Sequence, residues 1–208
     1  MPAGGRPPIN LPGPSGVLPA EMTVTLRRTL IERMAEDLLD DPPPQYRSLR
    51  SFDGFYRSEY REVVGLAFAL SGSRIAAEDI AQDAFLAAHK RWEQVGRYEK
   101  PEAWVRRVVA NLAVSAFRTR VREAGALARL KPRSSYLPSM PGEDAEFWKA
   151  VRALPRRQAQ VIALHYLEDR PVADIAVTLG CAEATVKVHL HKGRAGLSRR
   201  LGLTSEET

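Results

Sequence analysis

The chain is poor in the residues that build disulfide, metal and membrane proteins. Cysteine occurs once, at Cys181, so no disulfide can form within the chain. The four histidines are scattered and lack the spacing of a ligand set, which predicts neither a metal site nor a cofactor. The longest apolar run, residues 63–70, is far shorter than the roughly 20 residues that span a bilayer. With no signal-peptide pattern at the start, we expect no membrane insertion and a cytoplasmic location.

Side chains for catalysis are also missing as a set. Glu78, Asp79 and Asp83 fall close together on one expected helix. No nucleophile, glycine-rich phosphate loop or paired base accompanies them, so the sequence predicts that the protein is not an enzyme and has no catalytic residues. Positive charge, by contrast, is in excess: the net charge is +6 and the pI about 9.7. This excess fits a polyanionic partner or a plain basic surface, and composition does not separate the two.

The first 47 residues are expected to form an extension outside the folded domains. Six prolines and four glycines among residues 1–20 predict disorder. Within residues 22–39, apolar side chains recur every four positions, which predicts a short amphipathic helix that ends at the prolines of 42–44. That helix could cap the next domain, bind a partner, or lie upstream of a true start at Met22 or Met34; these alternatives stay open.

The remaining pattern is helical throughout and predicts an all-α protein. Residues 48–122 read as a first domain of three helices, with Ser71-Gly72 ending the first, Ser73 capping the second and Pro101 opening the third. A flexible linker rich in glycine, proline and serine is expected at 123–142. A second helical domain, 143–203, should start its helices near Glu143, at Pro155, at Pro171 and near Ala182.

The second domain carries the spacing of a helix-turn-helix. Ala176 supplies the small residue at the helix crossing, Gly180 tolerates positive φ in the turn, and Val186 anchors the second helix. That second helix is the one that such folds lay into the DNA major groove. Its outward residues should be Lys187, Val188, His191 and Lys192, with His189, Arg194 and Arg199 placed for phosphates.

The third helix of the first domain is strongly basic. Five arginines and no acid fall between residues 103 and 122, with Trp104 and Phe117 among them. Arginines with interleaved aromatics are typical of surfaces that hold phosphates and stack on unpaired bases. We therefore assign the arginines as a group to nucleic acid, and Phe117 to the core.

Four strings in this order resemble the extracytoplasmic-function sigma factors of bacterial RNA polymerase. They are A-E-D-I-A-Q-D-A-F-L-A-A-H-K-R-W (77–92), P-E-A-W-V-R-R-V-V-A-N-L-A (101–113), L-P-R-R-Q-A-Q-V-I-A-L-H-Y-L-E (154–168) and D-I-A-V-T-L-G-C-A-E-A-T-V-K-V-H-L-H-K-G-R-A-G-L (174–197). The resemblance implies sigma region 2 at 48–122 and sigma region 4 at 143–203. It implies a function in promoter recognition, DNA opening and transcription initiation, with core RNA polymerase, promoter DNA and an anti-sigma factor as partners.

The resemblance also implies a role for each matching residue. Polymerase binding would fall to Asp79, Gln82, Asp83 and Phe85. The melted promoter strand would meet Trp104, Arg106, Arg107, Asn111, Arg118 and Arg120. Promoter duplex would meet Lys187, Val188, His189, His191, Lys192 and Arg194.

The chain departs from the family pattern at Ser115, Gln160, Cys181, Val188 and His189. Val188 and His189 replace a small hydroxyl residue and an arginine, so the promoter preference should differ from that of relatives at this helix. The competing hypothesis is a stand-alone helix-turn-helix regulator that uses only residues 143–203. The acidic and arginine-rich strings of the first domain argue against it, because a plain regulator needs neither.

Overall fold

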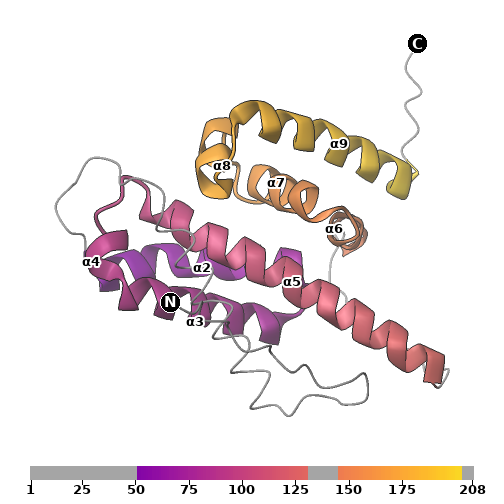
Figure 1. Cartoon of the computed structure of the whole chain (residues 1–208), viewed down its shortest axis with the longest axis horizontal. Coiled ribbons are helices and arrows are strands. Elements are labelled where there is room, and N and C mark those ends of the chain that lie inside the picture. The colour runs from indigo at the N-terminus through magenta and orange to yellow at the C-terminus, as the bar shows by residue number, and fades with distance from the viewer. Residues whose placement is uncertain (1–50, 131–144, 203–208) are drawn as a thin grey trace, which may run out of the picture.

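A computed structural model of the chain describes residues 51–130 and 145–202, and Figure 1 shows them as two helical groups packed together. The first group comprises α2 (Phe52–Ser71), α3 (Arg74–Lys90), α4 (Trp92–Val95) and α5 (Pro101–Leu130). The second comprises α6 (Ala145–Arg152), α7 (Arg156–Tyr166), α8 (Val172–Leu179) and α9 (Glu183–Leu201). Within these ranges there is no strand, so the all-α prediction is confirmed. The extension at 1–47 lies outside the described residues.

The first group is built around α2, α3 and α5, whose apolar faces are completely buried at Val63, Leu66, Ile80 and Val108. The boundary between α2 and α3 follows the expected signals. Gly72 ends α2 at φ 69°, in the left-handed region, and its N–H donates to Phe68 O at 2.7 Å. The Ser73 hydroxyl then accepts the Ala76 N–H at 3.3 Å and caps α3 as predicted.

Helix α5 is longer than the sequence pattern suggested. The linker was expected to begin at residue 123, but α5 continues through Leu130, so that boundary is wrong. Its last turns read E-A-G-A-L-A-R-L, which are mostly strong helix formers, and the single Gly125 costs only about 1 kcal/mol relative to alanine. The rest of the expected linker, 131–142, lies outside the described residues. Phe117, expected in the core, is half-buried.

The second group confirms the helix-turn-helix. Gly180 ends α8 at φ 61°, Ala176 is buried at the crossing of the helices, and Val186 is fully buried on the inner side of α9. Pro155 and Pro171 stand immediately before α7 and α8, as their predicted starts require. Helix α9 approaches α7 closely at Gly193, where an added Cβ would lie 2.9 Å from Ile162 Cγ1.

No helix among the described residues is long and apolar enough to cross a membrane.

Candidate polymerase and nucleic-acid interfaces

One face of α5 gathers most of the residues that the sequence assigns to melted DNA. Trp104, Arg107, Asn111 and Arg118 recur at intervals of three, four and seven residues and therefore share one side of the helix. We call these four residues the α5 face. Figure 1 shows α7 and α8 lying along the N-terminal part of α5. The second helical group therefore lies over the start of this face.

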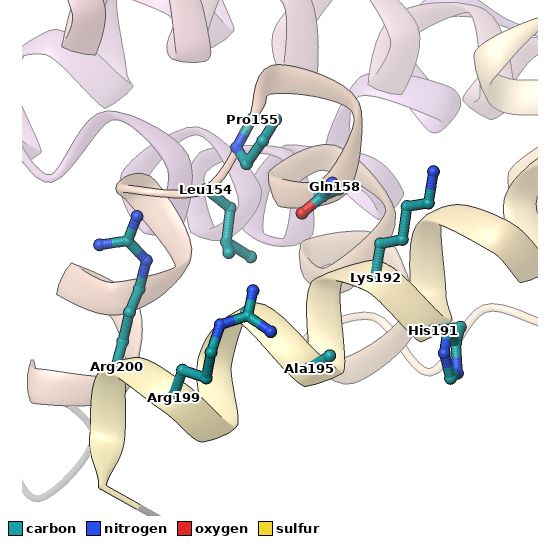
Figure 2. Close-up of a pocket in the computed structure, with 9 residues that line it drawn as sticks. Leu154, Pro155, Gln158, His191, Lys192, Ala195, Arg199 and Arg200 are labelled. Carbon is teal, nitrogen blue, oxygen red and sulfur yellow. The ribbon is translucent and has the colours of Figure 1, made fainter.

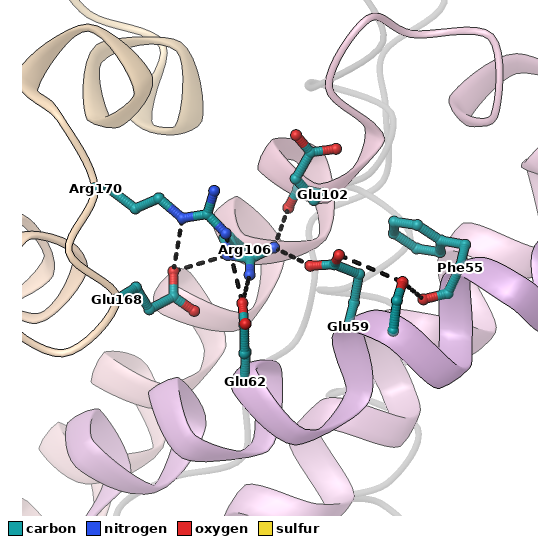
Figure 3. Close-up of polar contacts among 8 residues, drawn as sticks. Phe55, Glu59, Glu62, Glu102, Arg106, Glu168 and Arg170 are labelled. Atoms are coloured by element: carbon teal, nitrogen blue, oxygen red, sulfur yellow. Dashed lines mark hydrogen bonds and ion pairs between the residues drawn. The ribbon is translucent and has the colours of Figure 1, made fainter.

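Arg106, next to that face, is the centre of a buried ion cluster (Figure 3). Its side chain is 1% exposed and donates to Glu168 Oε2 at 2.7 Å, Glu59 Oε2 at 2.6 Å and Glu62 Oε2 at 2.5 Å. Glu59 and Glu62 belong to α2, whereas Glu168 follows α7 in the other helical group. We call these four residues the Arg106 cluster; it joins the two groups.

The turn after α7 aims Glu168 at Arg106. Asp169 takes a left-handed φ of 48°, which reverses the chain, and the Arg170 N–H donates to Leu164 O at 3.1 Å. Glu168 is 3% exposed in its side chain, and Arg170 Nε approaches its Oε2 at 3.8 Å. The turn therefore presents a buried carboxylate between two guanidinium groups.

Burial and pairing act on the two charges of this contact in opposite ways. Burial alone would lower the pKa of Arg106, but Glu168 and Glu59 outweigh it and raise that pKa. On Glu168, burial raises the pKa, and the opposing pull of Arg106 and Arg170 offsets only part of the shift. We treat the pair as ionised at neutral pH, because the 2.7 Å hydrogen bond from Arg106 Nε favours the carboxylate form.

Further contacts connect α5 and its preceding loop to the second group. Lys100 pairs with Asp174 of α8. Arg107 Nε donates to Thr178 O at 2.6 Å, at the C-terminal end of α8. The Asn111 amide oxygen accepts the Gln160 Nε2 at 2.8 Å. Arg107 and Asn111, which the sequence assigns to DNA, are thus hydrogen-bonded to the second helical group.

The other residues assigned to the melted strand differ in exposure. Trp104 is buried, and its indole N–H has no hydrogen-bond acceptor within the described ranges. Arg120 is half-buried and donates to Ser71 O at the end of α2. Arg118 is exposed. Of the six assigned side chains, Arg118 is the most open to a ligand in this arrangement.

Helix α3 exposes a mixed apolar and polar stripe. Ile75, Asp79, Gln82 and Leu86 lie on one side of the helix, and Ile75 and Leu86 are 77% and 55% exposed. We call these four residues the α3 stripe. Sequence reasoning missed Ile75 and Leu86, although their spacing of four and seven residues from Asp79 and Gln82 was available as a signal.

Two other residues assigned to polymerase binding lie off this stripe. Phe85 is 2% exposed and packs edge-on against Tyr56, with ring centroids 4.9 Å apart. Its position in the core follows from the helical period, which turns Phe85 about 100° away from its neighbour Leu86 on the stripe. Phe85 therefore supports α3 from inside, and Asp83 is half-buried beside it.

Helix α9 presents the side chains expected of a recognition helix. Lys187, Val188, His191 and Lys192 are all exposed. His189 is half-buried; burial lowers its pKa, and the nearby charges of Arg157 and Lys192 lower it further. Arg194 donates from Nε to the Tyr166 hydroxyl at 2.8 Å. His189 is therefore a weaker cation at neutral pH than its place in the helix suggests.

A basic cavity of about 610 Å³ opens between the start of α7 and the C-terminal half of α9 (Figure 2). Leu154, Pro155, Ala195 and Gly196 form its apolar part. The polar lining is Gln158, His191, Lys192, Arg199 and Arg200. This positive surface continues the exposed side of α9 and extends the area available to phosphates.

Comparisons with known proteins assign both helical groups. Residues 55–123 match the family model Sigma-70 region 2, and residues 144–197 match Sigma-70, region 4. Two solved structures share the fold. The sigma factor RpoE from Bartonella quintana, in complex with the anti-sigma factor NepR, has a TM-score of 0.54 at 22% identity, covering 74% of this chain and 98% of that one. CnrH, in complex with the cytosolic domain of CnrY, has a TM-score of 0.53 at 20% identity, covering 86% and 99%.

Curated relatives agree with these matches. ECF RNA polymerase sigma factor SigM of Mycobacterium tuberculosis is 30% identical over 154 residues, covering 73% of this chain and 78% of SigM. ECF RNA polymerase sigma factor SigE of Mycolicibacterium smegmatis is 27% identical over 176 residues, covering 77% of this chain and 65% of SigE. The chain therefore belongs to the ECF sigma factors, the promoter-directing initiation factors of RNA polymerase.

Proposed function

We propose that this sigma factor docks on core RNA polymerase through the α3 stripe, reads promoter duplex with α9, and holds the opened strand on the α5 face. The observation that carries the proposal is the separation of surface types. The α3 stripe is apolar and acidic on a protein of net charge +6, whereas the exposed side of α9 carries five lysines and arginines against one acid, Glu183. An apolar and acidic surface suits a protein partner, and a basic one suits DNA.

The α3 stripe has the make-up of a protein-binding patch. Two large apolar side chains, Ile75 and Leu86, stand well exposed at its ends. Asp79 and Gln82 lie between them and can fix the orientation of a partner by hydrogen bonds or charge. Burying exposed apolar area contributes about 25 cal/mol per Å², so these ends supply affinity while the polar middle supplies specificity.

The α9 surface suits duplex DNA. Lys187 and Lys192 are placed to contact base edges or phosphates, and Val188 can only touch an apolar group such as a thymine methyl. The cavity cations Arg199 and Arg200 extend the phosphate-binding area toward the end of the helix. We propose no enzymatic step, and we expect the protein to act in the cytoplasm with the polymerase.

An anti-sigma factor is a further proposed partner. Its support is that RpoE, which shares this fold, was solved with the anti-sigma factor NepR. The stand-alone regulator is disfavoured, because it uses only residues 143–203, whereas residues 55–123 match Sigma-70 region 2.

Polymerase docking is tested by pull-down of core enzyme with the full chain. Asp79→Arg combined with Gln82→Ala, and separately Leu86→Ser, should each reduce capture of the core enzyme at least about tenfold, since each alters an exposed contact. Glu93→Arg, an exposed charge reversal on α4, is the matched control and should bind normally. Normal capture by both stripe variants would refute the docking assignment, whereas failure of the wild-type chain to capture core enzyme would favour the stand-alone regulator.

A further inference from the structure

We propose that the free protein is self-inhibited: α7 and α8 cover the N-terminal part of the α5 face, and this second helical group must leave α5 before melted promoter DNA can bind. The inference rests on the proposed assignment of the α5 face to the opened strand. It adds a regulatory state that this assignment alone does not require. The partner that closes the face is the chain itself.

Melted DNA and the second helical group would compete for the same side-chain atoms of Arg107 and Asn111 on α5. Arg107 Nε is bonded to the Thr178 carbonyl at 2.6 Å. The Asn111 amide oxygen is bonded to Gln160 at 2.8 Å, and Arg156 of α7 donates to the same oxygen. An amide oxygen occupied in this way cannot at the same time pair with a base edge. Trp104, buried in this arrangement, cannot stack on a base either.

Ion pairs and hydrogen bonds join the two helical groups beside an apolar core to which both groups contribute. A buried ion pair gains Coulomb energy but loses the hydration of both ions, so its net contribution is small. When the groups separate, Arg106 and Glu168 regain water, as do Lys100 and Asp174. These pairs therefore fix the closed geometry, and the water that they regain on opening offsets part of their loss.

The contact between α7 and α9 is different in kind. It is apolar and close, with Ile162 packed against the backbone of α9 at Gly193. Opening should therefore move the second helical group as a unit and leave the helix-turn-helix intact.

Self-inhibition has a measurable consequence for DNA binding. The apparent affinity for a ligand is the intrinsic affinity multiplied by the fraction of protein in the binding-competent state. If the closed state exceeds the open state by tenfold or more, weakening the closure raises affinity for single-stranded DNA by about that factor. Removal of an ordinary DNA contact lowers the affinity for DNA. A variant that gains affinity has therefore lost a contact that closes the α5 face.

Closure itself is tested without polymerase or promoter. A carbodiimide activates the Asp174 carboxyl group, the Lys100 amine displaces the activated oxygen as the urea, and an amide links the two residues. We expect mass spectrometry of the free full-length protein to find this Lys100–Asp174 crosslink, and Lys100→Arg to abolish it. If other lysine–carboxylate pairs react and this one does not, the closed state is refuted, and the proposed function stands.

Inhibition is tested by binding of a fluorescein-labelled single-stranded oligonucleotide to the full chain. Glu168→Gln with Asp174→Asn should bind about tenfold more tightly than wild type and lose the crosslink. The control is Glu146→Gln with Glu183→Gln, which removes the same charge from exposed positions on α6 and α9. Affinity no higher than that of the control refutes self-inhibition.

A second pair of variants guards against misfolding of the first. Lys100→Asp alone should open the protein, and Lys100→Asp with Asp174→Lys should restore both the crosslink and the low affinity of wild type. Lys100 and Asp174 are partly exposed, so these exchanges leave the cores intact. If wild type gives the crosslink but every opened variant ignores single-stranded DNA, both self-inhibition and the α5 assignment are refuted.

Discussion

Replacing Arg106 with alanine should destabilise the folded protein by about 3 kcal/mol, even in the absence of DNA. The guanidinium is 1% exposed and bonded to three carboxylates. Its removal leaves Glu168, itself 3% exposed, without its 2.7 Å partner. Loss of one member of a buried pair costs about 3–5 kcal/mol, because the remaining charge stays out of water.

The lower end of that range follows from the geometry. Glu62 is 58% exposed, so solvent screens its contact with Arg106 and the pair contributes little. Arg170, 3.8 Å from the Glu168 carboxylate, can move in to replace part of the lost charge. Glu168, and to a lesser degree Glu59, therefore account for most of the effect.

Urea unfolding followed by circular dichroism measures the change. Arg107→Ala is the matched control, since loss of the hydrogen bond from Arg107 Nε to the Thr178 carbonyl at 2.6 Å should cost only about 1 kcal/mol. Arg106→Ala combined with Glu168→Ala should lose less than the sum of the single changes, by about 1–3 kcal/mol, because the double change leaves no unpaired charge at that contact.

A free energy of unfolding of Arg106→Ala within about 0.5 kcal/mol of wild type would refute the structural role of the Arg106 cluster. Arg106 would then be a DNA contact with no structural role, and its effect would be seen only in promoter opening.

Three further predictions concern α9. Gly193→Ala should lower the free energy of unfolding by about 1 kcal/mol, because overpacking against Ile162 outweighs the gain in helix propensity. The control is Gly65→Ala in α2, which has open space at its Cβ and should raise the free energy of unfolding by about 0.5–1 kcal/mol. Equal effects of the two substitutions would contradict the close packing at Gly193. Since the folded-state pKa of His189 lies below its ordinary 6.5, stability should decline as pH falls below about 6.5, and His189→Asn should remove this slope in a pH series of unfolding curves. Lys192→Ala should weaken promoter binding by about 1–3 kcal/mol if it reads a base, and an equal loss on non-promoter DNA would make it a phosphate contact.

Local signals predicted the helix boundaries well where a single residue controls the backbone. Gly72, Ser73 and Gly180 act through their own φ angles or hydroxyl group, so their neighbours in sequence suffice to locate them. The end of α5 was wrong because no residue near position 123 stops a helix and Gly125 alone is too weak.

The candidate sites were predicted less completely, since exposure depends on distant residues. Asp79 and Gln82 lie on the surface as the polymerase assignment needs, but Phe85 belongs to an aromatic core with Phe55 and Tyr56. The helical period places a residue on a face of its own helix. It does not say which neighbouring helix covers that face.

By itself, the sequence determined the all-α class, the helix-turn-helix and the family, because these depend on periodicity, caps and short motifs. Only the tertiary structure decided which basic residues are available to DNA. Arg106 and Arg118 look alike in sequence, yet one is enclosed by three carboxylates and the other is exposed. Glu168 is 62 residues from Arg106 in sequence. Burial and pairing across such a separation are set by how the two helical groups pack, and no local pattern encodes that contact.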